Sequence, residues 1–198
     1  MKNDIRIAVL VMIASLLYQG LVFSQTWTQR SPIPTERWNL TSVVVDGKIY
    51  VIGGQEGVSP YEALPTVEVY DPTTNTWEVK TPMSTPRWGV IAAVVNDKIY
   101  AIGGRGGTFE GGHYALGAVE EYDPKTNIWT YKTPMPTPRG WAGGSVIDDT
   151  IFVVGGRGTQ REEVTVEKYH PATDSWTAEQ PMPKLQGTSL MTAIFNSQ

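Results

Sequence analysis

The sequence predicts an all-β fold built from a repeated four-stranded antiparallel unit, and three observations support this. Tryptophan recurs at intervals of 50, 52 and 47 residues along the 198-residue chain. A Gly-Gly pair follows an aliphatic run three times, and a Tyr-x-Pro triplet precedes each later tryptophan. A period of about 50 residues is typical of repeat proteins in which each unit is one small sheet. The residues that carry the repeat are Trp27, Trp77, Trp129, Trp176, Gly53, Gly54, Gly103, Gly104, Gly155, Gly156, Tyr70, Tyr122 and Tyr169.

Spacing within the unit separates its rigid parts from its variable part. The distance from tyrosine to the next tryptophan is 7 residues in every unit. The distance from the arginine that follows the tryptophan to the first glycine is always 16 residues. Only the segment between the first glycine and the tyrosine varies, with lengths of 17, 19 and 14 residues. Constant spacing indicates segments fixed by packing, so the variable segment is expected to be an unconstrained loop.

Each unit contains four segments with the character of strands. The first is apolar and suits a strand buried on both faces, and a turn such as Asp46-Gly47 leads into the second. The third alternates apolar and polar residues, which predicts a half-buried strand, and the fourth carries the tryptophan. Four antiparallel strands per unit are typical of a propeller blade. The predicted strands are 40–45, 48–53, 66–70 and 76–80 in the first unit, with 90–95, 98–103, 142–147 and 150–155 as their equivalents in the others.

The Gly-Gly pair after Ile-Tyr-x-Ile, the Tyr-Asp-Pro turn and the tryptophan that follows resemble the Kelch repeat. The resemblance covers residues 27–195 and implies three complete Kelch-type blades at about 40–80, 90–132 and 142–179. In the third unit His170 replaces the aspartate of the turn. Gln186 stands where the other units have arginine. The expected fold is therefore an all-β set of β-propeller blades with partial flanking strands and an open, incomplete ring.

The flanking segments predict two isolated strands. Residues 26–30 have the pattern of an outermost strand, and residues 188–195 have that of an innermost strand. Three blades are fewer than the usual four to eight, which favours a truncated copy of a longer propeller. Uncovered strand edges of this kind promote pairing with other chains, so self-association is expected.

The first 24 residues predict a secretory signal. Lys2 and Arg6 precede an almost wholly apolar run at 7–18, and a small-residue site ends at Ser24. The alternative is an uncleaved anchor, but 7–23 spans only 17 residues and a bilayer needs about 20. The prediction is a mature chain of residues 25–198 that is secreted, periplasmic or extracellular, with no stable membrane span after cleavage.

Composition excludes several classes of site. The chain has no cysteine, which excludes disulfides, thiolate metal sites and cysteine nucleophiles. It has two histidines, so a histidine-rich metal site is not expected, and neither is a cofactor. The net charge of −4 offers no basic surface for nucleic acid.

Candidate binding residues lie in the connections that emerge on one face of the blades. Arg37, Arg87 and Arg139 precede the innermost strands, at the mouth of the central channel in Kelch proteins, and could bind a carboxylate, a sulfate or an acidic peptide through two hydrogen bonds. The alternative is an inter-blade ion pair or a carbonyl clamp. The variable loops 55–65, 105–117 and 157–163 emerge on the same side.

Aromatic residues adjoin those arginines. They would stack on a sugar or peptide side chain, or pack against the neighbouring blade. The full predicted binding face is Arg37, Trp38, Arg87, Trp88, Arg105, His113, Tyr114, Arg139, Trp141 and Arg157, in which Trp141 is displaced by one position from the repeat.

Two functional hypotheses follow from the resemblance, together with the possibility of a truncated copy that has no activity of its own. The first is a non-catalytic binding module that presents its loop face to a protein or glycan partner. The second is a sugar-modifying propeller enzyme. Its copper-radical form needs a cysteine and is excluded, whereas a form similar to sialic acid mutarotases would use Arg139, Glu110 or His113 as acid–base groups. The first hypothesis is preferred, and no catalytic residue is predicted.

Overall fold

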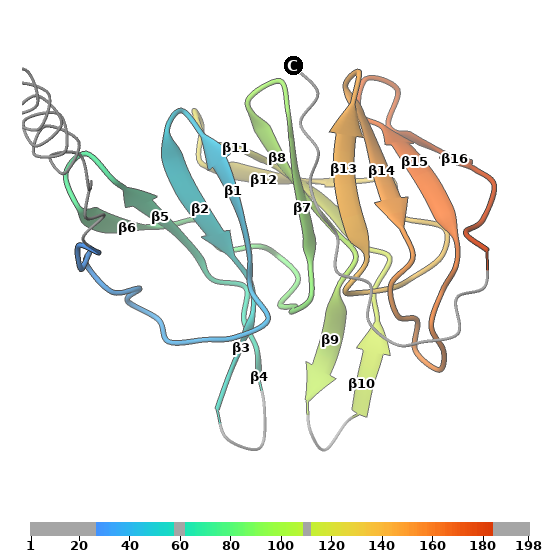
Figure 1. Ribbon diagram of the computed structural model, residues 1–198, viewed down its shortest axis with the longest axis horizontal. Helices are drawn as coiled ribbons and strands as arrows, with labels where there is room; N and C mark the ends of the chain where they lie inside the picture. The colour runs from blue at the N-terminus through green and yellow to red at the C-terminus, as the bar shows by residue number, and fades with distance from the viewer. Residues whose placement is uncertain (1–26, 58–61, 109–111, 184–198) are drawn as a thin grey trace, which may run out of the picture. The chain divides into compact units, whose positions relative to one another are not determined.

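The computed structural model describes residues 27–57, 62–108 and 112–183. In these ranges the chain forms sixteen β-strands and no α-helix, so none of its described segments is a helix able to cross a membrane. The chain divides into two compact units, residues 1–30 and 31–198, and all sixteen strands belong to the second (Figure 1).

Three of the four sheets are blades with one topology. In each blade four antiparallel strands pair in chain order from inner to outer, and the variable loop always separates the second strand from the third. This confirms the all-β fold and the blades expected from the sequence. Blade 1 contains β1 (Thr41–Val45), β2 (Lys48–Ile52), β5 (Val67–Asp71) and β6 (Thr76–Lys80). Blade 2 contains β7 (Ile91–Val95), β8 (Lys98–Ile102), β11 (Val119–Asp123) and β12 (Ile128–Lys132). Blade 3 contains β13 (Gly143–Ile147), β14 (Thr150–Val154), β15 (Val166–His170) and β16 (Ser175–Ala178).

The inner hairpins turn through residues with positive φ. In the β1–β2 turn, Asp46 has φ 50° and Gly47 has φ 68°. The equivalent turns place two non-glycine residues in this region, for example Asp148 at 47° and Asp149 at 57°. Such turns match the right-handed twist of the strands that they join. Aspartate and asparagine tolerate this backbone conformation better than other non-glycine residues do.

The blades pack face to face through two apolar clusters, and β7 lies next to both β1 and β13. Each cluster contains one contact between a tyrosine of one blade and the repeat tyrosine of the next. The ring centroids of Tyr50 and Tyr122 lie 6.1 Å apart, and those of Tyr100 and Tyr169 lie 5.9 Å apart. The blade 2–blade 3 interface therefore repeats the blade 1–blade 2 interface.

The Gly-Gly pairs mark the places where the backbone of the next blade comes close. Gly53 has φ 64°, and the amide of Gly54 donates a 3.0 Å hydrogen bond to the carbonyl of Arg87. Gly104 makes the same bond, also 3.0 Å, to the carbonyl of Arg139. A side chain at Gly53 would collide with the Arg87 carbonyl, because an added Cβ would lie 2.5 Å from its oxygen. Close approach therefore explains the pair.

Three of the repeat tryptophans each join their blade to the segment that enters it, through a set of hydrogen-bonded side chains that we call the latch. The remaining one, Trp27, is fully exposed. In blade 2 the Trp129 indole donates a 2.8 Å hydrogen bond to the carbonyl of Thr81. The Thr81 amide donates to Asn127 Oδ1 at 3.0 Å, and the Tyr122 hydroxyl donates to the same oxygen at 2.7 Å. The equivalent residues are Ser31, Tyr70, Asn75 and Trp77 in blade 1 and Thr133, Tyr169, Asp174 and Trp176 in blade 3.

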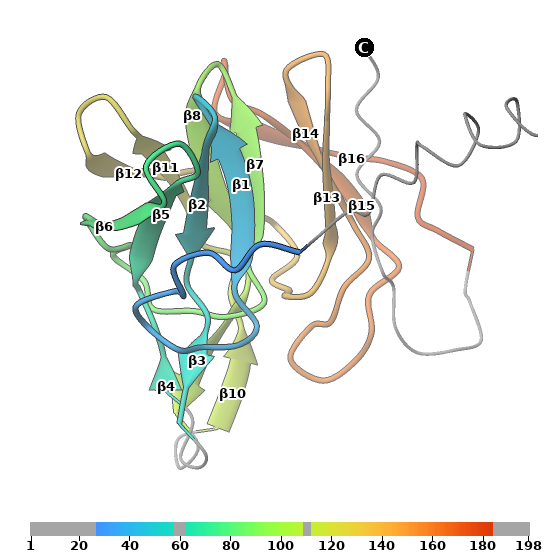
Figure 2. The same ribbon diagram turned by 60° about the vertical axis from the view of Figure 1, so that its left-hand side comes forward.

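A fourth sheet was not predicted. It joins the variable loops of blades 1 and 2 in the order β10-β9-β4-β3 and extends away from the blades, at the bottom of Figures 1 and 2. The loop of blade 3 adds one contact, a 3.1 Å hydrogen bond from the Ala115 amide to Thr159 Oγ1. We call this sheet together with Thr159 the loop wall. Its strands are β3 (Gln55–Glu56), β4 (Glu62–Ala63), β9 (Arg105–Thr108) and β10 (Gly112–Ala115). The described parts of these loops therefore pair with each other and are not the unconstrained loops that the spacing predicts.

The predicted flanking strands have different outcomes. Residues 27–30 form no strand, so in its described part the outer strand predicted at 26–30 is wrong. The physical reason is that a strand requires a hydrogen-bonded neighbour, and no described strand pairs with these residues. The predicted inner strand at 188–195 and the predicted signal at 1–24 lie outside the described residues.

Candidate functional site

The three repeat arginines lie inside the blades. Their side chains have no exposed surface, and each forms an ion pair with a glutamate of the third strand in the same blade. Arg37 Nη1 lies 2.5 Å from Glu68 Oε2, and Arg87 Nη2 lies 3.0 Å from Glu120 Oε1. Arg139 Nη1 pairs with Glu167 Oε2 in the same way.

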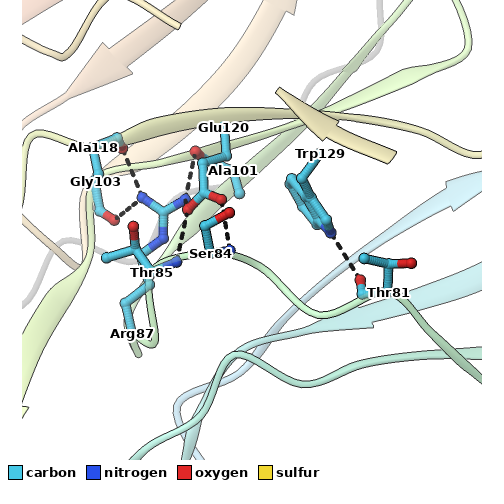
Figure 3. A network of polar contacts seen from close by, with 9 residues as sticks. All are labelled: Thr81, Ser84, Thr85, Arg87, Ala101, Gly103, Ala118, Glu120 and Trp129. Atoms are coloured by element: carbon cyan, nitrogen blue, oxygen red, sulfur yellow. Dashed lines mark hydrogen bonds and ion pairs between the residues drawn. The ribbon is translucent and has the colours of Figure 1, made fainter. Parts of the chain in front are cut away.

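Arg87 shows the full set of contacts (Figure 3). Besides Glu120, its guanidinium donates to the carbonyls of Ala118 at 2.7 Å, Gly103 at 3.1 Å and Ala101 at 3.2 Å. On the other side of the pair, Glu120 accepts the amides of Ser84 and Thr85. Burial lowers the pKa of Arg87 to about 10, although the Glu120 charge acts in the opposite direction. The arginine remains charged at neutral pH.

These contacts do not support the prediction that Arg37, Arg87 and Arg139 bind a ligand. A guanidinium that is buried and bonded to a carboxylate and to carbonyls has no donor left at the surface. The alternative given by the sequence, a carbonyl clamp, is confirmed for all three. The ion pair, however, joins the segment before the inner strand to the third strand of the same blade, and it does not join two blades.

The glutamates of these pairs are functional residues of the fold that the sequence analysis missed. The third strand was expected to be half-buried, yet Glu68 and Glu120 are as buried as their apolar neighbours. A signal was present, because a glutamate stands two residues before the tyrosine in every repeat. Its arginine partner lies 31, 33 or 28 residues earlier, and this variable distance conceals the pairing.

Arg105 is also buried, and it holds two loops together. Its guanidinium donates to the carbonyl of Gly158 at 2.8 Å and to that of His113 at 3.3 Å. These bonds connect the loop wall to the loop of blade 3. Trp88 is buried beside it, and its ring meets the His113 ring edge-on at 4.9 Å. The predictions that Arg105 and Trp88 contact a ligand are therefore not supported by their positions, because both side chains are buried.

The remaining predicted residues do reach the surface of this face. Trp38 is 45% exposed, Tyr114 is 50% exposed and Trp141 is 41% exposed. His113 and Arg157 are exposed as well. The structure thus brings three large aromatic side chains, one histidine and one arginine to the side that carries the loop wall.

Trp141 has an unusual backbone conformation for its residue type. Its φ is 50°, in the left-handed region that Asn39 and Gly89 occupy at the equivalent positions of the other blades. A bulky residue in this region costs about 1–3 kcal/mol. The ring lies against Gly89, and the Arg105 guanidinium carbon is 5.3 Å from the ring centroid.

The most strongly displaced pKa values belong to groups in the blade interiors. Burial raises the pKa of Tyr122 to about 12 and raises those of Tyr100 and Tyr169 further. On the loop face, burial lowers the pKa of Arg105 and the neighbouring Arg157 lowers it further. Across the described ranges, no three acidic or histidine side chains are grouped so as to hold a metal ion. Glu110, one of the acid–base candidates, lies outside those ranges.

Repeated four-stranded blades, inner strands side by side and loops gathered on one face define a protein of the propeller class. Two family models match the sequence: the KLHDC2/KLHL20/DRC7 Kelch-repeats domain over residues 17–156 and the Kelch motif over residues 138–183. The chain belongs to the Kelch-repeat family.

Individual relatives agree with this assignment. The chain is 34% identical over 138 residues to the Kelch-like protein terF of Aspergillus terreus, which covers 67% of this chain and 30% of that protein. It is 28% identical over 131 residues to mouse Kelch-like protein 35, covering 66% of this chain and 22% of the relative. Thus it spans less than a third of the length of these relatives. Among solved structures, that of YjhT superposes with a TM-score of 0.69 at 20% identity, covering 81% of this chain and 57% of the other.

Proposed function

We propose that this chain is a non-catalytic interaction module that binds a protein partner on the face formed by the loop wall and the exposed Trp38, Tyr114 and Trp141. One observation carries the proposal: the described parts of the loops of all three blades are hydrogen-bonded to each other beside these aromatic side chains. Aromatic residues fixed on a rigid frame are the usual anchors of protein interfaces. The described turns on the opposite face are short, such as Asp46-Gly47.

The chemistry of the loop face favours binding over catalysis. The displaced pKa values of the tyrosines and of Arg87 arise within packed blades, where they accompany structural hydrogen bonds. Active sites generally concentrate such shifts in a cleft. Here the acid–base candidate Arg139 is committed to its ion pair with Glu167.

A photo-crosslinking experiment tests the binding face. A photoreactive phenylalanine analogue replaces Tyr114 on the loop face or Lys125 in the β11–β12 turn, and the crosslinked proteins are identified by mass spectrometry. Both positions are exposed, so they differ mainly in the face of the molecule at which a bound partner would be crosslinked. The proposal expects one specific protein to crosslink at position 114 and not at position 125. Crosslinks only from position 125, or none from either position in the native environment, would refute it.

We also propose that the module acts outside the cytoplasm, because residues 1–24 have the charge, length and apolar core of a secretory signal. N-terminal sequencing of the protein recovered from its native compartment should give a start near Gln25. Recovery of an intact Met1 from the cytoplasm would contradict this assignment.

A further inference from the structure

Trp141 is out of register with the other blades for a steric reason. The residue pairs that join the start of each inner strand to its loop are equivalent in the three blades: Trp38 with Gln55, Trp88 with Arg105, and Gly140 with Arg157. Gly140, not Trp141, therefore takes the place of the other two tryptophans. A side chain there would collide with Arg105, since an added Cβ would lie 2.9 Å from Arg105 Cγ.

The displacement exposes the indole on the loop face, where Trp141 is 41% exposed and belongs to neither apolar cluster. Trp141 occupies the position held by Asn39 in blade 1 and Gly89 in blade 2, so its left-handed backbone belongs to the repeat. The exposure of a large aromatic ring at this position is the reason to look for a ligand.

The surroundings of Trp141 carry more positive than negative charge. Arg105 lies against its ring, and Arg157 is close enough to Arg105 to lower the pKa of that guanidinium. Arg157 is 55% exposed, and its own partner Glu162 is 3.7 Å away and equally exposed. Exposed pairs of this kind are weak. Arg161 pairs with Glu163, so the loop and Arg105 together contain three arginines and two glutamates.

We propose that Trp141 and Arg157 form a subsite for an acidic peptide segment of the partner. In this subsite a partner carboxylate pairs with Arg157, and the apolar side chain next to it stacks on the exposed part of the Trp141 indole. The planar guanidinium suits two hydrogen bonds to a carboxylate, and the second guanidinium of Arg105 adds to the attraction. This inference rests on the proposed function, because it specifies the partner of the same face.

Paired synthetic peptides test the subsite. An array presents acidic peptides, each beside a counterpart in which Asp or Glu is replaced by Asn or Gln, and binding is quantified by fluorescence polarisation. The wild-type chain should prefer the acidic members. Trp141→Asn and Arg157→Met should each weaken that binding about tenfold or more, the range of an interface anchor. Asparagine is suitable because Asn39 already occupies this conformation in blade 1.

Two matched variants control for general effects. Arg161→Met removes an exposed arginine of the same loop, and Tyr131→Ala removes an exposed aromatic ring of β12. Tyr131→Ala should leave peptide binding unchanged, and Arg161→Met, which removes the same charge outside the subsite, should weaken it much less than Arg157→Met does. Near-ultraviolet circular dichroism checks the fold, and if Trp141→Asn fails to fold, Arg157→Met decides, because that side chain is at the surface.

The outcomes separate the subsite from the proposed function. Acidic peptides that bind equally well to the wild type and to Arg157→Met would overturn the subsite and leave the protein-binding face intact. Binding restricted to acidic glycans on a parallel array would overturn the peptide assignment. An absence of any peptide binding, combined with no crosslink at position 114, would overturn both proposals.

Discussion

At the scale of single residues, the arginine of each repeat is retained by packing and not by a ligand. Removing a guanidinium and a carboxylate from water is costly, and each blade offsets the cost with carbonyl acceptors around the pair. The sequence correctly placed Arg87 just before an inner strand. It could not show that Glu120 lies against it, because the variable loop between them changes the spacing from one repeat to the next.

Breaking one of these pairs is expected to destabilise the chain strongly. Arg87→Met leaves Glu120 buried without its counter-charge, and the free energy of unfolding should fall by about 3–5 kcal/mol. The double variant Arg87→Met/Glu120→Met removes both charges and should lose less than either single variant. Urea denaturation followed by fluorescence measures all three. Strictly additive losses would contradict a coupled ion pair.

At the scale of secondary-structure elements, the latch and the loop wall differ in how well the sequence predicts them. The latch follows from invariant spacing, since Asn127 is five residues after Tyr122 and Trp129 two residues further. The loop wall does not. Its strands include the two-residue β3 and the glycine-rich β9, neither of which alternates apolar and polar residues. In the part of the chain that the structure describes, the loops of blades 1 and 2 are joined by one residue pair, Glu62 with Thr108.

The latch predicts a graded effect of substitutions at Asn127. Asn127→Ala deprives the Tyr122 hydroxyl and the Thr81 amide of one shared acceptor, and it should lower the free energy of unfolding by about 1–3 kcal/mol. Asn127→Asp should cost much less, because Asp174 fills this role in blade 3. Thermal unfolding of the two variants checks the order. Equal losses would show that the acceptor oxygen is not the important group.

The buried latch tyrosines also predict a loss of stability at alkaline pH. Burial, assisted by the neighbouring Tyr50 and Glu78, raises the pKa of Tyr122 from 10.0 to about 12. The unfolded chain therefore releases this proton first, so the contribution to stability is complete below pH 10.0 and declines as pH rises toward 12. Tyr122→Phe should have a lower free energy of unfolding than the wild type at neutral pH. Urea titrations should show that this free energy falls less steeply as the pH becomes alkaline. Tyr131→Phe, on the exposed side of β12, should keep the wild-type slope.

At the scale of the whole chain, one repeat position changes its environment from blade to blade. Val45 of blade 1 and Val95 of blade 2 are buried against the following blade, whereas Ile147 of blade 3 is 48% exposed. On the other side of the array, Val94 packs in the first apolar cluster and its equivalent Val44 is 60% exposed. Within the described residues, therefore, the two outer surfaces of the array retain the apolar character of blade interfaces.

These two surfaces predict that the chain self-associates. Repeat arrays bury apolar faces only against a neighbour, and uncovered ones associate. Sedimentation velocity should show larger species as concentration rises, and Val44→Lys with Ile147→Lys should shift the distribution toward monomer. Val79→Lys, at an equally exposed valine of the outer strand β6, is the control and should change nothing. A wild-type chain that remains monomeric at all concentrations would contradict the prediction.

The position of the latch residues has a consequence for how such a gene can be lengthened or recombined. Ser31, Thr81 and Thr133 each precede the arginine of the blade that they fasten. Segments 31–80, 81–132 and 133–179 therefore each contain a complete latch and a complete Arg–Glu pair. A crossover at the start of a sheet, such as Thr41, would separate Arg37 from Glu68. Duplication or exchange at residues 31, 81 and 133 would keep each blade together with its own polar partners. The segment that a gene rearrangement can move as one unit therefore begins before the first strand of its sheet.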